Sequence, residues 1–160
     1  VAALRSFTVD AGVDVVSFGG TKAGLLGGEA VVYLDAALAQ RAKYVRKMVN
    51  QLPSKMRFVA AQFNALLDDD LWIKGAQHSN QMALQLYEAT RHIPGVEFDH
   101  APQVNSLFPQ LPADAIAALC DWCFFWDWDI SRRQVRWMTA WDTTADDVDR
   151  FAAGVRHLLG

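Results

Sequence analysis

The chain has 160 residues, of which 52% are hydrophobic and 21% are charged. This length suits one domain, or one domain with a fragment of another, and the composition is that of a globular protein with a buried core. A net charge of −3 argues against nucleic acid or an anionic membrane surface as the main partner. No apolar run approaches the roughly 18 residues that span a bilayer, and the first residues lack the pattern of a signal peptide. We therefore expect a cytoplasmic protein, and a chain that begins inside a longer parent because it does not start with Met.

The first predicted elements are two short strands joined by a loop that holds a single lysine. Apolar, β-rich runs cover residues 13–18 and 30–34, and the glycine-rich loop between them carries Lys22. Glycine flanks let a planar group approach the backbone closely, and a short loop at a strand end fixes the position of its lysine. Such a lysine suits Schiff-base chemistry, which needs fixed geometry and surroundings that favour the neutral amine.

The same loop also has a simpler interpretation, because glycine-rich loops with a solvated lysine are common. The loop is not a P-loop, which needs glycine directly before the lysine and a hydroxyl residue directly after it. Here Thr21 precedes Lys22 and Ala23 follows it. The spacing alone leaves a catalytic lysine and a solvated lysine open.

Three helices are predicted next. Residues 35–49 form a basic helix, and a second helix begins at Pro53, a residue that suits the first helical turn. Its apolar residues recur at helical spacing as far as Leu67, and the aspartates at 68–70 end it. A third helix covers about 71–92.

The last part of the chain has the pattern of a small α+β unit. Strands are expected at 96–100, 104–111, 123–128 and 134–140, and helices at 113–120 and from Thr143–Thr144 onward. This β-β-α-β-β-α order predicts helices on one face of a largely antiparallel sheet. Most of a dense aromatic set is expected in the core of the last strand pair; it comprises Trp122, Phe124, Phe125, Trp126, Trp128, Trp137 and Trp141.

A single C-x-x-C motif is formed by Cys120 and Cys123. A zinc site would need two further ligands at suitable spacing, and the sequence has no second cysteine pair. A redox motif usually opens a helix after a strand, whereas Cys120 ends a helical pattern here. We therefore expect no metal and two reduced thiols that are buried or half-buried.

The two strands around Lys22 cannot form a stable sheet alone. We therefore expect residues 1–34 to be the tail of a larger sheet whose other strands lie outside this chain. Residues 35–92 are expected to be connecting helices, and residues 93–160 a small carboxyl-terminal α+β domain. The predicted fold class is α/β passing into α+β.

Three stretches together resemble a known enzyme family: residues 10–22 around Lys22, residues 54–58 around Arg57, and residues 135–144 around Arg136. In this order they resemble the low-specificity L-threonine aldolases, which depend on pyridoxal 5′-phosphate (PLP) and have fold type I, in the superfamily that includes β-eliminating lyases. The resemblance covers nearly the whole chain. It implies that the chain is the carboxyl-terminal half of such an enzyme, with residues 1–34 ending the PLP-binding large domain.

The resemblance also implies roles for particular residues. Lys22 would be the lysine that forms a Schiff base with PLP, with Thr21 beside it in the cofactor site. Arg136 would bind the substrate α-carboxylate, and Arg57 would lie near the cofactor phosphate or reach a neighbouring subunit's site. Without the resemblance, both arginines would be interpreted as solvated surface charges. Asn105 matches an asparagine at the start of a small-domain strand, where a structural turn and a site role stay open.

The sequence departs from the family pattern in two ways. Many relatives have asparagine after the lysine, where this chain has Ala23, so a local hydrogen bond that tunes substrate preference is in doubt. The family's phosphate-binding loop, ring-stacking histidine and ring-nitrogen aspartate lie upstream and are not found here. The four histidines, His78, His92, His100 and His157, match none of these roles.

For the intact protein, the resemblance implies retro-aldol cleavage of L-threonine, L-allo-threonine and related β-hydroxy-α-amino acids into glycine and an aldehyde. It also implies a homodimer or homotetramer with an amino-acid substrate. Two alternatives stay open: a non-catalytic chain that folds and oligomerises, and another PLP-dependent β-eliminating lyase. We expect this chain alone to be inactive and to hold PLP poorly.

Overall fold

The computed structural model describes residues 2–160. They form two compact units that divide between Trp72 and Ile73, and each unit is described by itself. This division falls inside the stretch 35–92 that was expected to connect two domains. None of the helices in residues 2–160 is long and apolar enough to cross a membrane.

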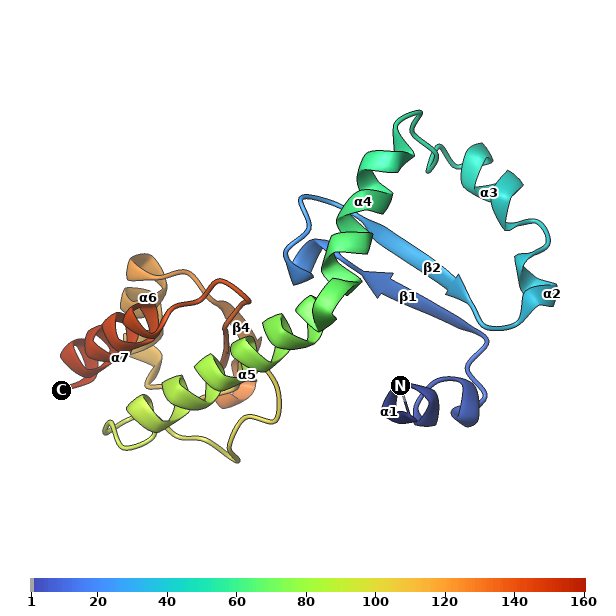
Figure 1. The fold of residues 1–160 in the computed structure, drawn as a ribbon. Helices are drawn as coiled ribbons and strands as arrows, with labels where there is room; N and C mark the ends of the chain where they lie inside the picture. The colour runs from blue at the N-terminus through green and yellow to red at the C-terminus, as the bar shows by residue number, and fades with distance from the viewer. Residues whose placement is uncertain (1) are drawn as a thin grey trace. The chain divides into compact units, whose positions relative to one another are not determined.

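The first unit is built on a β-hairpin, as predicted. Strand β1 (Val15–Gly19) pairs antiparallel with β2 (Glu29–Tyr33), and the register runs from Val15 opposite Tyr33 to Gly19 opposite Glu29 (Figure 1). Helix α1 (Ala2–Ser6) and the 3₁₀ turn η1 (Val9–Ala11) precede the hairpin.

The predicted basic helix over 35–49 is wrong as a single element. The structure has α2 (Ala36–Ala39), capped by the Asp35 carboxylate through a 2.8 Å bond from Ala37 N, and then a separate α3 (Ala42–Met48). Neither helix has a buried residue. Because helices in proteins are stabilised mainly by packing of an apolar face, nothing in this stretch favours one continuous helix.

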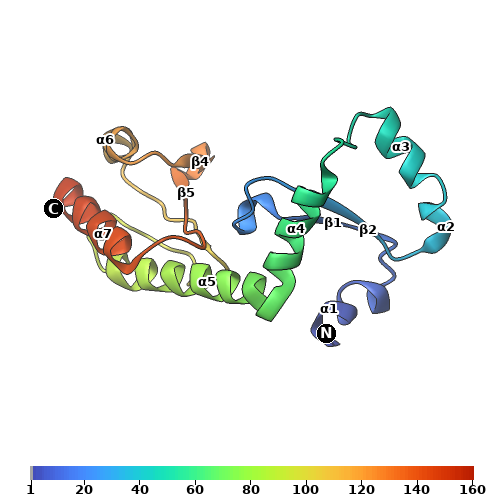
Figure 2. The same cartoon turned by 45° about the horizontal axis from the view of Figure 1, so that its top comes forward.

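Helix α4 (Met56–Leu67) lies against the hairpin (Figures 1 and 2). It starts three residues after the predicted Pro53 and ends, as predicted, at the aspartates, which form η3 (Asp68–Asp70). Asp69 and Asp70 have positive φ angles of 48° and 55°, a backbone that cannot continue a helix. Helix α5 (Leu71–Thr90) follows them.

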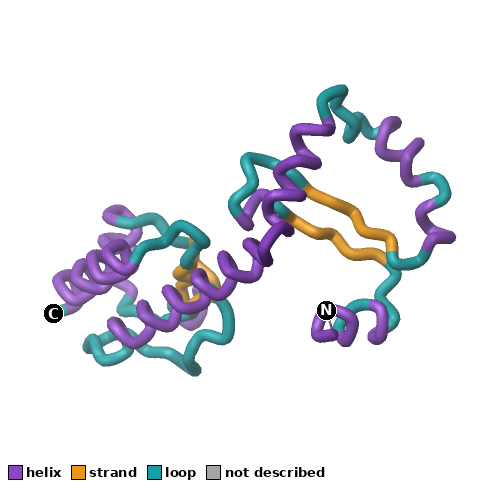
Figure 3. The backbone as a smooth tube through the Cα atoms, in the orientation of Figure 1, coloured by secondary structure: helices purple, strands orange, loops and turns teal. Residues whose placement is uncertain are grey.

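The second unit is an antiparallel sheet covered by helices, as predicted (Figure 3). Its strand order is β3-β5-β4, with β3 at Ser106–Leu107, β5 at Gln134–Met138 and β4 at Trp126–Asp129. Helices α6 (Ala113–Trp122) and α7 (Ala145–Leu159) are close to their predicted ranges. The core joins these elements to α5 and includes Leu86, Leu107, Leu119, Val135, Trp137 and Val155.

The predicted strand over 96–100 is wrong, and the strand over 104–111 shrinks to the two residues of β3. Glu97 and Gln110 form only an isolated bridge, with N–H···O bonds of 3.1 and 2.8 Å. Pro109 and Pro112 lack the N–H that a strand ladder needs. Gly95, at φ +87°, turns the chain just before the bridge.

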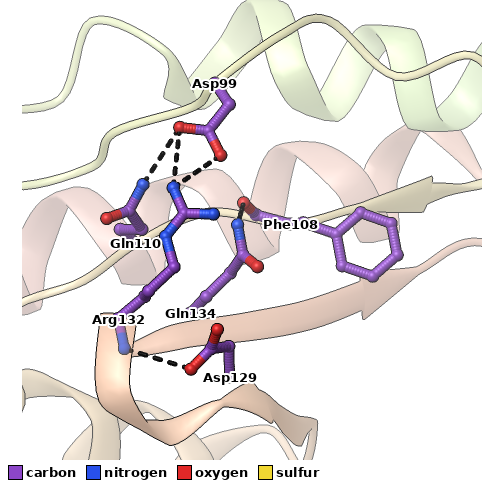
Figure 4. Close-up of polar contacts among 6 residues, drawn as sticks. All are labelled: Asp99, Phe108, Gln110, Asp129, Arg132 and Gln134. Atoms are coloured by element: carbon purple, nitrogen blue, oxygen red, sulfur yellow. Dashed lines mark hydrogen bonds and ion pairs between the residues drawn. The ribbon is translucent and has the colours of Figure 1, made fainter.

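Polar side chains hold this irregular segment in place (Figure 4). The Asp99 carboxylate accepts bonds of 3.0 and 2.7 Å from Arg132 Nη2 and one of 3.2 Å from Gln110 Nε2. Gln134 Nε2 donates to the Phe108 carbonyl at 3.1 Å. Side-chain bonds therefore replace the backbone ladder that the alternating sequence pattern had suggested.

The aromatic set is mostly outside the core, contrary to the prediction. Phe125 and Trp137 are buried, at 8% and 3% exposed, whereas the other five are between 48% and 67% exposed. Strand β4 lies at an edge of the sheet, and Trp126 and Trp128 lie on its outward side. A run of aromatic residues on an edge strand cannot all reach one core, because successive side chains point to opposite faces.

Helix α7 begins with a capping box formed by Thr144 and Asp147. Asp147 Oδ2 accepts from Thr144 N at 3.0 Å and from Thr144 Oγ1 at 2.6 Å, and Thr144 Oγ1 accepts from Asp147 N at 3.1 Å. These bonds from Thr144 hold the pKa of the exposed Asp147 carboxyl below its ordinary value. Asp146, beside it, faces solvent and pairs with Arg150 at 3.6 Å.

We expect Asp147→Ala to lower the free energy of unfolding near neutral pH more than the matched control Asp146→Ala. A depressed pKa contributes stability that is present above the ordinary value and is lost as the pH falls through the depressed one. The difference between the variants should therefore shrink on acidification, as measured by urea unfolding between about pH 7 and pH 3. Equal losses at neutral pH, or a difference that grows in acid, would contradict this account.

Candidate active site

Lys22 lies on a loop whose two ends are tied to each other. It is in the 3₁₀ turn η2 (Thr21–Ala23) between β1 and β2, and its side chain is exposed. Gly20 N donates to the Gly28 carbonyl at 2.9 Å, and Gly28 N donates to Thr21 Oγ1 at 3.1 Å. The loop turns at Gly24, which has a φ of +105° that favours glycine. The backbone thus fixes the base of Lys22 while its amine stays accessible.

Helix α4 supports this loop from one side. Leu26 N donates to Gln62 Oε1 at 2.9 Å. A Cβ added at Gly28 would come within 2.9 Å of Phe63 and 3.2 Å of Val59. Phe63 also packs against Phe18 of β1, with ring centroids 6.0 Å apart. This support was not predicted from the sequence, although a glutamine beside the apolar residues of a helix is a usable signal.

Arg57 is on α4 but not on the side that holds the loop. At about 100° per residue, the five positions from Arg57 to Gln62 correspond to about 140° around the helix axis. The Arg57 guanidinium carbon lies 4.8 Å from the centroid of the Phe58 ring, and the residue is exposed. Thr21, next to Lys22 in the sequence, bonds to the base of the loop, whereas Arg57 lies on a different side of α4 from Gln62.

Arg136 lies on β5, the central strand of the second unit, whereas Lys22 belongs to the first unit. Its neighbours Val135 and Trp137 point into the core, at 0% and 3% exposed, which sends Arg136 to the outward face. Its guanidinium carbon lies 5.6 Å from the centroid of the Trp128 ring. Its Nε is buried and has no acceptor within residues 2–160.

Asn105 has the contacts of a turn residue. Its Nδ2 donates to the Thr139 carbonyl at 2.7 Å, and Thr139 N donates back to the Asn105 carbonyl at 3.1 Å. The hydroxyl of Thr139, which is buried, donates to the Ser79 carbonyl of α5 at 2.7 Å. The bonds between Asn105 and Thr139 support the structural interpretation of Asn105.

Of the histidines, His78 is bonded through Nε2 to the Thr143 carbonyl at 2.7 Å.

The cysteine pair has the character of ordinary thiols. Cys120 is partly buried, as expected, and its Sγ donates to the Phe125 carbonyl at 3.5 Å. The expectation that Cys123 is also buried or half-buried is wrong, because Cys123 follows the end of α6 and is exposed. Partial desolvation and the neighbouring Cys120 raise the pKa of the Cys123 thiol, and a protonated thiol is a poor nucleophile and metal ligand. Across residues 2–160, no group of three or more His, Cys, Asp or Glu side chains is placed to hold a metal ion.

Comparison with known proteins identifies what the chain is similar to. It is 40% identical over 152 residues to the low-specificity L-threonine aldolase of Pseudomonas aeruginosa, which covers 94% of this chain and 43% of that protein. It is 38% identical over 154 residues to the enzyme of the same name from a Pseudomonas species, covering 95% and 44%. The resemblance seen in the sequence motifs is therefore confirmed.

A solved structure shows the same fold. The threonine aldolase of Leishmania major superposes with a TM-score of 0.82 at 28% identity, over 95% of this chain and 45% of that one. This confirms the predicted fold class, that of part of a threonine aldolase. The chain thus spans less than half the length of the relatives it matches, which fits the prediction of a half-chain. No family model matches the chain.

The support of the lysine loop by α4 can be tested at two adjacent glycines. We expect Gly28→Ala to lower the stability of the first unit by about 1–3 kcal/mol, because the added methyl overpacks Val59 and Phe63. The control Gly27→Ala meets nothing within 4 Å and should change it by no more than about 0.5 kcal/mol. Urea unfolding followed by circular dichroism measures both, and equal effects would contradict the packing of Gly28 on α4.

Proposed function

We propose that this chain is the carboxyl-terminal part of a PLP-dependent aldolase that cleaves L-threonine and L-allo-threonine, and related β-hydroxy-α-amino acids, into glycine and an aldehyde. The observation that carries this proposal is the exposed Lys22 on a loop tied by Gly20, Thr21, Gly28 and Gln62. The 40% identity to a low-specificity L-threonine aldolase supports it. We also propose a cytoplasmic location.

Lys22 would hold the cofactor, with Thr21 beside it. Its side chain is exposed, and its backbone is fixed by the bonds that Gly20 and Thr21 make with Gly28. These features fit PLP. When bound, PLP supplies the electron sink for cleavage of the Cα–Cβ bond, whereas the protein supplies orientation and electrostatics.

Arg136 would bind the α-carboxylate of the substrate. Its guanidinium is a planar, permanently charged fork that suits two parallel bonds to a carboxylate. Within residues 2–160, its buried Nε has no acceptor, and no carboxylate forms an ion pair with this side chain. The guanidinium is therefore available to bind an anion from outside this chain. Holding the carboxylate fixes which bond of the substrate is aligned for cleavage, which is an orientation effect.

Arg57 would act on a neighbouring subunit's cofactor phosphate in a homodimer or homotetramer. Its place on the side of α4 away from the lysine loop supports a role outside its own site. Residues for the phosphate, the ring face and the ring nitrogen were not found in this sequence. We therefore propose that the site is completed by the rest of the protein, and that this chain alone is inactive.

A second candidate is a chain that folds and associates without catalysis. The exposed Trp126 and Trp128 on an edge strand, at 62% and 57%, favour it, because exposed apolar surface promotes association. Another PLP-dependent β-eliminating lyase is a third candidate. It would share Lys22 and differ in the product it releases.

The role of Lys22 is tested by cofactor trapping in the full-length protein. After addition of PLP and reduction with borohydride, peptide mapping is expected to find the pyridoxyl adduct on Lys22. The variant Lys22→Ala should lose the adduct and more than about 10³-fold of the threonine cleavage rate, whereas Lys43→Ala, an exposed lysine of the same unit, should change neither by more than about twofold. An adduct on another lysine, or full activity of Lys22→Ala, would refute the assignment. Release of ammonia instead of glycine would favour the third candidate.

The role of Arg136 is tested by a substitution that keeps its charge. Arg136→Lys replaces the planar fork by a point charge, so we expect the KM for L-threonine to rise about 10-fold. The matched control is Arg133→Lys, an exposed arginine three residues earlier, which should leave KM within about twofold. Steady-state kinetics of the full-length protein measure both, and an unchanged KM in Arg136→Lys would remove Arg136 from substrate binding.

A further inference from the structure

A β-bulge lies beside Arg136. Strands β4 and β5 pair regularly from Trp126 opposite Arg136 to Asp127 opposite Val135, but the next pair is Asp129 opposite Gln134. Trp128 is the extra residue that has no partner across the ladder. A bulge of this kind re-aims a side chain, and bulges are frequent beside active sites.

The bulge residue is the one that contacts Arg136. The Trp128 ring lies 5.6 Å from the Arg136 guanidinium carbon, within the range in which a cation is attracted to an aromatic face. Trp126, although directly opposite Arg136, packs instead against Phe124, with ring centroids 5.0 Å apart. The two tryptophans of β4 therefore have different partners.

Trp128 also contacts a second aromatic residue. Phe108, which follows β3, packs on it with ring centroids 4.9 Å apart and planes tilted by 52°, and the Phe108 carbonyl accepts the bond from Gln134 Nε2. Trp128 is 57% exposed, so burial in the core does not explain its place. Phe108 after β3, Trp128 of β4 and Arg136 of β5 thus lie together on the outward face of the sheet, and we call this group the stack.

The stack leaves the guanidinium without an anionic partner. Within residues 2–160, no carboxylate pairs with Arg136 and its Nε has no acceptor. The nearby Asp129 carboxylate is already bonded to Ser131 Oγ at 2.6 Å and to Arg132 N at 3.2 Å. A cation held against a ring in this way is oriented in advance for an incoming anion, which lowers the ordering cost of binding.

We propose that Trp128 is a positioning residue for the substrate carboxylate: the bulge in β4 turns its indole onto Arg136 and holds the guanidinium ready for binding. This inference rests on the proposed function of Arg136. It assigns Trp128 no contact with the reacting atoms. It predicts an effect on substrate binding rather than on the rate of the bound complex.

The first arm of the test is kinetic, in the full-length protein. Trp128→Leu removes the aromatic face and is expected to raise the KM for L-threonine about 2- to 5-fold with kcat nearly unchanged, the effect of losing a cation–π contact at an exposed position. Trp128→Phe, which keeps a ring, should restore most of the loss. The control Trp126→Leu, on the same strand and face, should stay within about 1.5-fold.

The second arm needs no turnover. Phenylglyoxal modifies accessible arginines, and mass spectrometry of peptides reports the rate at Arg136. We expect acetate to slow modification of Arg136 relative to chloride at equal ionic strength, and the half-protecting acetate concentration to rise about 2- to 5-fold in Trp128→Leu but not in Trp126→Leu.

The outcomes separate this inference from the proposed function. Acetate protection that depends on Trp128, found in a protein whose Lys22 binds no PLP, supports the stack and refutes the aldolase. A raised KM in Arg136→Lys with Trp128→Leu equal to Trp126→Leu overturns the inference and leaves the aldolase standing. If Trp128→Leu does not fold, Phe108→Leu, which loosens the indole from behind, should raise KM in the same direction, and an unchanged KM there overturns the inference.

Discussion

The alternation of side chains along β5 is the constraint on which the second unit depends. Val135 and Trp137 enter the core, and Leu107 and Phe125 pack with them in the same cluster, so the strand cannot slip by one residue without exchanging its faces. Arg136, between the two buried residues, is consequently committed to the outward face. The packing that stabilises this unit and the placement of its proposed substrate-binding group are therefore set by the same register.

In the first unit the corresponding constraint is the small volume of Gly28. The loop approaches α4 so closely that an added methyl group would force Phe63 and Val59 to shift, and Gln62 of the same helix bonds to the loop backbone. Lys22 itself needs no side-chain partner to be placed, because the backbone on both sides of it is bonded. The Lys22 amine can thus remain exposed while its backbone stays fixed, which suits the role proposed for it.

The sequence predicted the elements whose signals are local. The hairpin around Lys22 and the helix begun by Thr144 follow from strand-like runs and a capping pattern, and both are present. Errors arose where tertiary context decides: residues 96–100 alternate like a strand but face a proline-interrupted partner, and most of the aromatic set lies outward on an edge strand. The direction of Arg57 and the bulge at Trp128 depend on helix phase and strand register, which no local pattern in this chain reveals.

The buried hydroxyl of Thr139 connects two elements of the second unit. It joins the end of β5 to the middle of α5 by donating to the Ser79 carbonyl. Asn105, just before β3, is bonded to the backbone of Thr139. Three segments far apart in the sequence thereby meet at Thr139, so local unfolding of α5 or of the segment at Asn105 removes bonds that hold Thr139. Fluctuations of the segment at Asn105 are thus coupled to Thr139, three residues after Arg136, so the stiffness of the proposed carboxylate-binding face depends on segments outside its own strand.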